Sequence, residues 1–166
     1  MNTANGSEKQ AHTGIHVRLY TPADQEFVLS LAPRLLVGVA PWIDPERVLE
    51  AARGWITESS AGHGSQTMVF VAEDAHRERL GFASVSRQRH YTGEPQAYIG
   101  ELAVAEAAEG QGAGTMLVRA CERWAHEQGY AQIVLDTGFA NERGRHFYER
   151  LGYREETVKL VRRLEP

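Results

Sequence analysis

The chain has 166 residues, 42% of them hydrophobic, which predicts one globular domain with a substantial core. Its 18 basic and 22 acidic residues leave a net charge of −4, which argues against nucleic acid as the main partner. No apolar run reaches the roughly 20 residues of a membrane-spanning helix, and no signal-peptide core precedes residue 15. We therefore expect a cytoplasmic protein with no membrane partner, in which a disordered tail (residues 1–14) precedes a single domain (15–166). Cys121 is the only cysteine, so no intrachain disulfide is expected.

The N-terminal half predicts a strand, two helices and then two strands. Apolar and polar side chains alternate over residues 15–20, which is typical of a strand. Capping residues followed by proline predict helices over residues 21–31 and 45–58. Runs of β-branched and aromatic residues predict strands over 67–73 and 80–91.

The next strand leads into a glycine loop and a helix. Residues 98–104 are apolar except for Glu101, which indicates a largely buried strand. Gly110, Gly112 and Gly114 follow, and apolar side chains then recur at helical spacing as far as Gly129. A strand that feeds a helix through such a loop directs the unpaired N–H groups of the helix at an anion. The spacing excludes a dinucleotide fingerprint and a Walker-type loop, because neither the third glycine nor the Gly-Lys-Ser/Thr ending is present.

The C-terminal part predicts a strand over residues 133–137 and then a short helix. Asn141 suits the start of that helix and Gly152 its end. Apolar and charged residues alternate over 153–164, which predicts one or two closing strands. Together these elements predict a mixed α/β domain.

Two segments resemble signatures of the GNAT superfamily, the acetyl-CoA-dependent N-acetyltransferases. The glycine loop resembles the pyrophosphate loop of that family, although Glu109 stands where the family usually has Arg or Gln. The second signature consists of an asparagine, a small residue, an aromatic pair and a closing Gly-aromatic pair: Asn141, Gly144, Phe147, Tyr148, Gly152 and Tyr153. The alternative for this second segment is the ordinary core stripe of an amphipathic helix.

The resemblance implies a GNAT-type acyl-CoA N-acyltransferase fold, in which a central mixed sheet of six to seven strands is flanked by four helices. In that fold the fourth and fifth strands separate, and CoA lies between them. The residues that would bind acetyl-CoA are Leu102, Ala103, Val104, Glu109, Gly110, Gln111, Gly112, Ala113, Gly114, Thr115, Asn141, Phe147 and Tyr148.

Acetyl transfer to an amine requires a base for the amine and an acid for the departing thiolate. The resemblance assigns the base to Glu101, whose pKa burial would raise, and the acid to Tyr148. A phenol with a reference pKa of about 10 stays protonated where a thiol of about 8.5 does not. The alternative for Glu101 is a hydrogen-bonded structural carboxylate or one that faces solvent.

The resemblance implies a small-molecule or peptide amine as acceptor, with Trp42, Ile43 and His90 as candidate substrate contacts. The alternative is ordinary core packing for Trp42 and Ile43, and simple exposure for His90. The seven histidines show no paired ligand spacing, so no metal is expected. The resemblance also admits a homodimer. The remaining alternatives are an enzyme that uses another acyl-CoA and a weakly catalytic acyl-CoA sensor or scaffold module.

Overall fold

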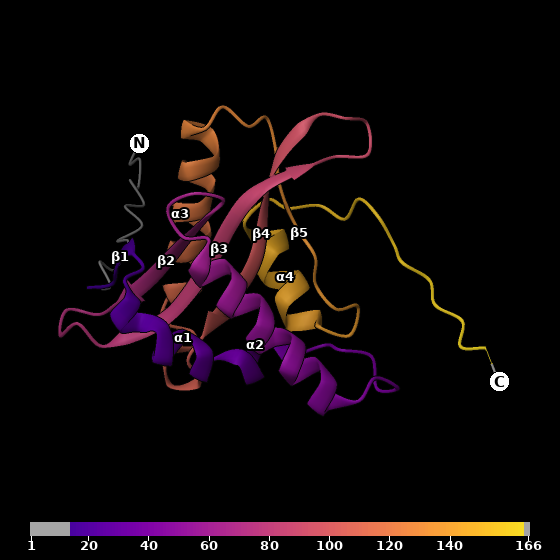
Figure 1. Ribbon diagram of the computed structural model, residues 1–166, viewed down its shortest axis with the longest axis horizontal. Coiled ribbons are helices and arrows are strands. Elements are labelled where there is room, and N and C mark those ends of the chain that lie inside the picture. Colours follow the sequence, from indigo (N-terminus) through magenta and orange to yellow (C-terminus); the bar gives the residue numbers. More distant parts are fainter. Residues whose placement is uncertain (1–13, 165–166) are drawn as a thin grey trace, which may run out of the picture.

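One five-stranded sheet forms the centre of the protein (Figure 1). The computed structural model describes residues 14–164, so the predicted N-terminal tail lies outside the described residues except for Gly14. The strands follow one another across the sheet in chain order: β1 (His16–Leu19), β2 (Thr67–Glu73), β3 (Arg79–Arg89), β4 (Pro95–Val104) and β5 (Ile133–Leu135).

The sheet opens between its last two strands. Strands β1 to β4 are antiparallel, whereas β5 runs parallel to β4. Their pairing ends at Ile99 opposite Leu135, although β4 continues for five more residues to Val104. The second half of β4 therefore faces an opening where the ladder between β4 and β5 would otherwise continue, as the resemblance predicts.

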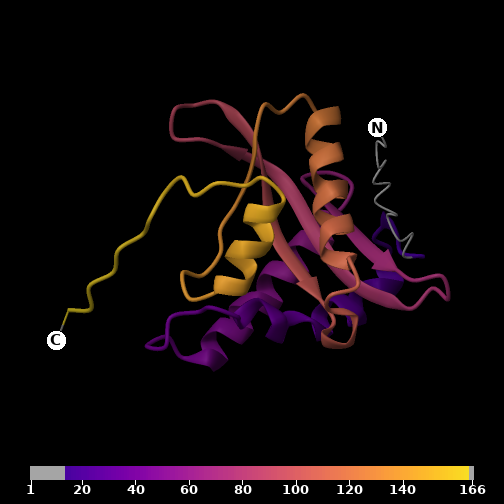
Figure 2. The same cartoon turned by 180° about the vertical axis from the view of Figure 1, so that it is seen from behind.

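Within residues 14–164, four α-helices cover the two faces of the sheet: α1 (Gln25–Ser30), α2 (Pro45–Ala61), α3 (Ala113–Glu127) and α4 (Glu142–Arg150). The same range holds three short 3₁₀ helices: η1 (Pro22–Asp24) before α1, η2 (Ala32–Leu36) between α1 and α2, and η3 (Glu106–Ala108) between β4 and α3. Figures 1 and 2 show α1 and α2 on one face, with α3 and α4 on the other. Each face has its own core, formed around Val28 and Ile56 on one side and around Leu117 and Val118 on the other.

The predicted closing strands are wrong. Residues 153–164 form neither helix nor strand, so the part of the chain that the structure describes has five strands instead of six to seven. The segment leads away from the domain (Figures 1 and 2), and Val158, Leu160 and Leu164 are 73%, 90% and 82% exposed. Alternation predicts a strand only where a neighbouring edge is available, and β5 offers an edge of only three residues.

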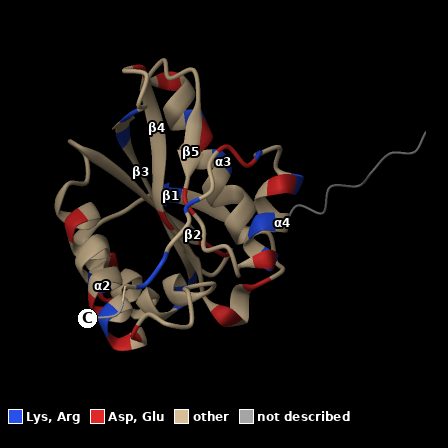
Figure 3. Cartoon of the chain, turned by 90° about the vertical axis from the view of Figure 1, so that its right-hand side faces the viewer, with Lys and Arg blue, Asp and Glu red and all other residues tan. Residues whose placement is uncertain are grey.

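The surface carries both signs of charge. Acidic and basic residues are interspersed over the ribbon in the view of Figure 3. Among the described residues, no helix combines the length and the apolarity that crossing a bilayer requires.

Candidate functional site

A cavity of about 570 Å³ lies at the opening between β4 and β5. We call it the central cavity. It brings together four residues that the sequence predicts as site residues: Glu101, Leu102, Asn141 and Tyr148. Side chains from α2, β3, β4, α4 and the segment after β5 all reach it, so the sheet and its helices jointly define its shape.

Glu101 is the buried acid of the central cavity, with only 4% of its surface exposed. A bulge places two residues of β4, Gly100 and Glu101, opposite the single residue Ser84 of β3. Such bulges re-aim side chains next to functional sites. The Ser84 hydroxyl donates to the Glu101 carboxylate and accepts the Glu101 backbone N–H at 3.1 Å. Ser59 of α2 donates to the same carboxylate at 2.9 Å.

The environment of Glu101 favours a proton on its carboxylate more than water does. Burial is the main cause that raises its pKa, and the negative charge of Glu58 acts in the same direction. The hydrogen bonds from Ser84 and Ser59 oppose this shift without cancelling it. The pKa of the carboxylate is therefore shifted toward neutral pH, as a general base requires.

Gly100 makes the contact between Ser84 and Glu101 sterically accessible. A Cβ atom at position 100 would lie 2.9 Å from the Ser84 oxygen, closer than real Cβ contacts. The glycine therefore leaves the space in which the serine hydroxyl reaches the carboxylate.

Tyr148 reaches the central cavity from α4. Burial is the main cause that raises the pKa of its phenol to about 12, so the hydroxyl remains protonated at neutral pH. Its ring lies edge-on to Phe147 and Tyr153, with centroids 5.0 and 5.7 Å away. These contacts fix the orientation of a protonated donor at the cavity wall.

Asn141 performs the expected capping role at the start of α4. Its side-chain oxygen accepts the Gly144 N–H at 3.0 Å, and its amide donates to Thr137 at 3.1 Å. A Cβ at position 144 would come within 2.3 Å of the Asn141 amide nitrogen. Gly144 therefore makes room for the capping side chain.

A further polar pair lies in the central cavity. The Tyr98 hydroxyl donates to the Asp136 carboxylate at 3.1 Å, across the last paired positions of β4 and β5. Burial and the charge of Asp136 raise the pKa of Tyr98 to about 12. This pair links the two strands at the point where they separate.

The glycine loop has a backbone shape that suits an anion. Gly110 and Gly112 have φ angles of 75° and 96°, in the left-handed region that side chains disfavour. A Cβ at Gly110 would meet nothing within 4 Å, so the space beside this residue of the loop is open. Ala113 begins α3, whose first N–H groups have no carbonyl partner within the helix. These features fit a diphosphate.

The side chains around the glycine loop have different functions. Ala113 is buried in the core, and a Cβ at Gly114 would lie 3.4 Å from the ring of Phe147. Gln111 donates to the Ala107 carbonyl at 2.8 Å instead of projecting freely, and Thr115 is half-buried in the first turn of α3. The backbone of the loop, more than its side chains, is thus available to a ligand.

Glu109 holds two arginines beside the glycine loop. Its carboxylate pairs with Arg34 from η2 and, at 2.6 Å, with Arg143 from α4. Arg34 also lines the central cavity and donates to the Val104 carbonyl at 3.2 Å. Arg34 therefore connects the end of β4 with the glycine loop. Ala103, the strand residue next to Val104, faces the core and is buried.

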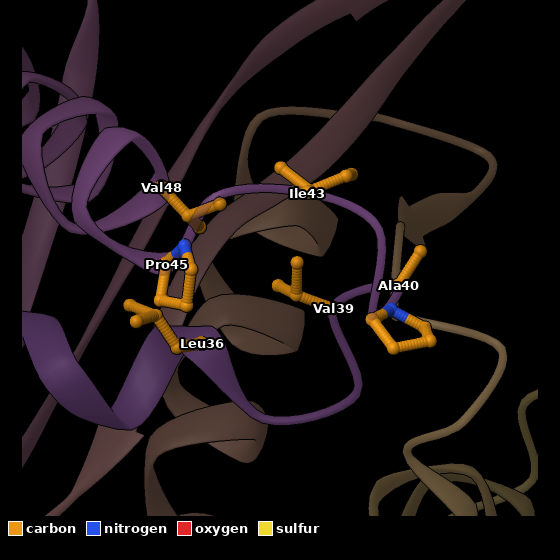
Figure 4. A pocket seen from close by; sticks show the side chains of 7 residues that line it. Leu36, Val39, Ala40, Ile43, Pro45 and Val48 are labelled. Carbon is orange, nitrogen blue, oxygen red and sulfur yellow. The ribbon is translucent and has the colours of Figure 1, made fainter. Parts of the chain in front are cut away.

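The three predicted substrate residues lie outside the central cavity. Trp42 is 52% exposed. Ile43 lines a smaller, apolar cavity of about 150 Å³ between η2 and α2, together with Leu36, Val39, Ala40, Pro41, Pro45 and Val48 (Figure 4). His90 lies in the β3–β4 hairpin, where its ring contacts Thr92 at 2.7 Å.

Several cavity residues have no part in the sequence prediction: Arg34, Trp55, Glu58, Ser59, Ser84, Tyr98 and Asp136. Ser84 carried a usable signal, since it is a polar residue inside an apolar strand, as Glu101 is. Arg34 carried none, because its partners Val104 and Glu109 are 70 and 75 positions away. Within residues 14–164, no group of three or more potential metal-ligating side chains gathers at one place.

Comparison with known proteins identifies the family. Residues 32–153 match the sequence model described as "Acetyltransferase (GNAT) family". The chain is 36% identical over 85 residues to N-alpha-acetyltransferase 30 of Schizosaccharomyces pombe, a match that covers 51% of this chain and 55% of that protein. The chain thus spans little more than half the length of this relative.

Solved structures share the fold. A putative acetyl transferase from Pyrococcus furiosus superimposes with a TM-score of 0.72 and 24% identity, over 90% of this chain and 99% of that one. The aminoglycoside N-acetyltransferase AAC(6')-Iy in complex with CoA gives a TM-score of 0.64 and 19% identity, over 90% and 94% of the two chains.

Proposed function

This chain belongs to the acetyltransferase (GNAT) family and is an acyltransferase, and we propose that it transfers an acetyl group from acetyl-CoA to a primary amine in the central cavity. In this proposal, Glu101 is the general base and Tyr148 the general acid. The observation that carries it is the position of both side chains in one cavity, at the opening between β4 and β5.

Glu101 accepts the proton that the attacking amine loses. An amine in its ammonium form has no lone pair with which to attack, so a nearby base must remove the proton. Ser59 and Ser84 fix the carboxylate, and burial raises its pKa toward the working pH.

Tyr148 supplies the proton at the opposite end of the reaction. When bound, acetyl-CoA supplies an activated thioester, whose sulfur leaves as a thiolate. Because burial keeps the Tyr148 phenol protonated, this hydroxyl is a competent donor to that sulfur. The side chain therefore needs only to point at the thioester.

The backbone from Leu102 to Val104 and the glycine loop are the groups that would hold the co-substrate. The edge of β4 beyond Ile99 has no partner in β5, so its polar groups, apart from the Val104 carbonyl that accepts from Arg34, are available to an extended ligand. The loop before α3 offers the N–H groups for phosphate, with Gly110 and Gly112 in left-handed conformation.

The test is an acetyl-transfer assay with acetyl-CoA and two sets of acceptors, namely small diamines and amino sugars, and short peptides with a free N-terminus. The peptides are included because one relative is named an N-alpha-acetyltransferase. Release of free thiol with a matching mass increase of the acceptor is the expected result. Binding of acetyl-CoA without turnover on any acceptor would instead favour a sensor or scaffold module.

A further inference from the structure

The cluster of Arg34, Glu109 and Arg143 contains two cations and only one anion. Two guanidinium groups share a single carboxylate, so the cluster carries a net positive charge. Each guanidinium has five N–H donors, and the hydrogen bond from Arg143 to Glu109 uses one of them. The Arg143 side chain is 76% exposed, so its other donors face solvent.

The position of this cluster points to an anion with more acceptors than a carboxylate. Glu109 directly precedes the glycine loop, and Arg34 reaches from the loop to the central cavity. Arg143 lies in the first turn of α4, where the helix dipole disfavours a cation. A positive charge placed there, close to Glu109, becomes favourable when a multiply charged anion is added.

We propose that Glu109 is a placeholder for phosphate: it holds Arg34 and Arg143 at the glycine loop, and the diphosphate of CoA displaces its carboxylate from both guanidinium groups. This inference rests on the proposed function, since it assigns the phosphate site of the same co-substrate. It also explains how the loop works without the family's Arg or Gln at position 109, because cations from η2 and α4 take that place. No bond is made or broken in this exchange of ion pairs.

The inference predicts the sign of a mutational effect. If Glu109 competes with phosphate, then Glu109→Gln frees both guanidinium groups and tightens CoA binding. If Glu109 instead shapes the loop for its ligand, the same substitution weakens binding. The two roles of this carboxylate therefore give opposite results.

The experiment is calorimetric titration of CoA, dephospho-CoA and pantetheine into the full chain at low ionic strength. We expect Glu109→Gln to lower the CoA dissociation constant by about 3- to 10-fold, the scale of one or two partly exposed ion pairs. The matched control is Glu106→Gln, which removes the same charge from an exposed side chain three residues earlier and shifts binding by less than about twofold.

A second pair of variants tests the arginines. Arg143→Gln weakens CoA binding by about 3- to 10-fold. The control is Arg150→Gln, at the other end of α4. The gain in Glu109→Gln is retained with dephospho-CoA and absent with pantetheine. A gain that is lost with dephospho-CoA, or equal with pantetheine, overturns the assignment to the diphosphate. Circular dichroism of each variant confirms that it is folded before titration.

CoA binding by the unmodified chain separates a failure of the Glu109 role from a failure of the proposed function. CoA binding by the unmodified chain with no gain, or a loss, in Glu109→Gln overturns the placeholder role and leaves the proposed function standing. No CoA binding by the unmodified chain or by either glutamate variant overturns the proposed function together with this inference.

Discussion

Removal of one hydroxyl tests whether the protein stabilises an ionised Glu101. Ser84→Ala deletes a donor to the carboxylate and the acceptor of the Glu101 backbone N–H, inside a site where Ser84 is 1% exposed. A hydrogen bond to a charged group contributes about 1.5–3 kcal/mol to stability. For a domain of this size that loss lowers the thermal midpoint by about 3–12 °C at pH 8.

The cost of Ser84→Ala should also depend on pH. Burial already raises the pKa of Glu101, and the Ser84 hydrogen bond opposes that shift, so the variant has a still higher pKa. A raised folded-state pKa means that stability present at low pH is lost as pH rises through that value. The variant therefore loses more stability than the unmodified chain between pH 5 and pH 8, and the acidic limb of kcat/KM moves to higher pH.

Differential scanning calorimetry at pH 5 and pH 8 measures this effect, with Ser60→Ala as the control. The Ser60 oxygen is buried with no hydrogen-bond partner in the described part of the chain, so its removal costs little. Equal midpoints for the two serine variants, or a Ser84→Ala loss that is the same at both pH values, would refute the assignment of Ser84 as the carboxylate's support.

Three further expectations concern other parts of the molecule. Tyr148→Phe should lower kcat by about 10²- to 10⁴-fold while the thermal midpoint stays close to its original value, because only a proton donor is lost; an unchanged kcat in thiol-release assays contradicts the acid role. Gly38→Ala should lower the free energy of unfolding by about 2–5 kcal/mol in urea titrations, and Gly64→Ala by about 1–2 kcal/mol. Both glycines have φ near 80°, but only a Cβ at position 38 would strike Asn141, at 2.5 Å. Equal losses in the two variants would show that the contact with Asn141 is irrelevant. Cys121 is fully buried and its pKa is raised to about 12, so a thiol reagent should label it only at the rate of unfolding; fast labelling of the folded chain contradicts this burial.

The sequence predicted the structure best where an element depends on its own residues and not on distant ones. Strand β2 begins and ends at the predicted residues, and the helix after Asn141 has the predicted cap. Glycines 110 and 112 take the left-handed conformation that a tight anion-binding loop requires. In these places the local pattern and the final fold agree.

The sequence was least informative where distant segments meet. The closing strands failed because alternation over residues 153–164 says nothing about whether a partner edge exists. The supports of Glu101 come from α2 and β3, and the partners of Glu109 come from η2 and α4. A replacement such as Glu109 for Arg or Gln is interpretable only when these partners are known. Local spacing cannot supply them.

The pH dependence of acetyl transfer by Glu101→Gln shows whether Glu101 is the general base of the reaction. The unmodified chain should lose kcat/KM on the acidic side as the Glu101 carboxylate takes up a proton. The variant should be about 10²- to 10⁴-fold slower at neutral pH and should recover as pH approaches the pKa of the acceptor amine, because the amine then loses its proton without help. A variant with the rate and the profile of the unmodified chain would contradict the assignment of Glu101 as the base.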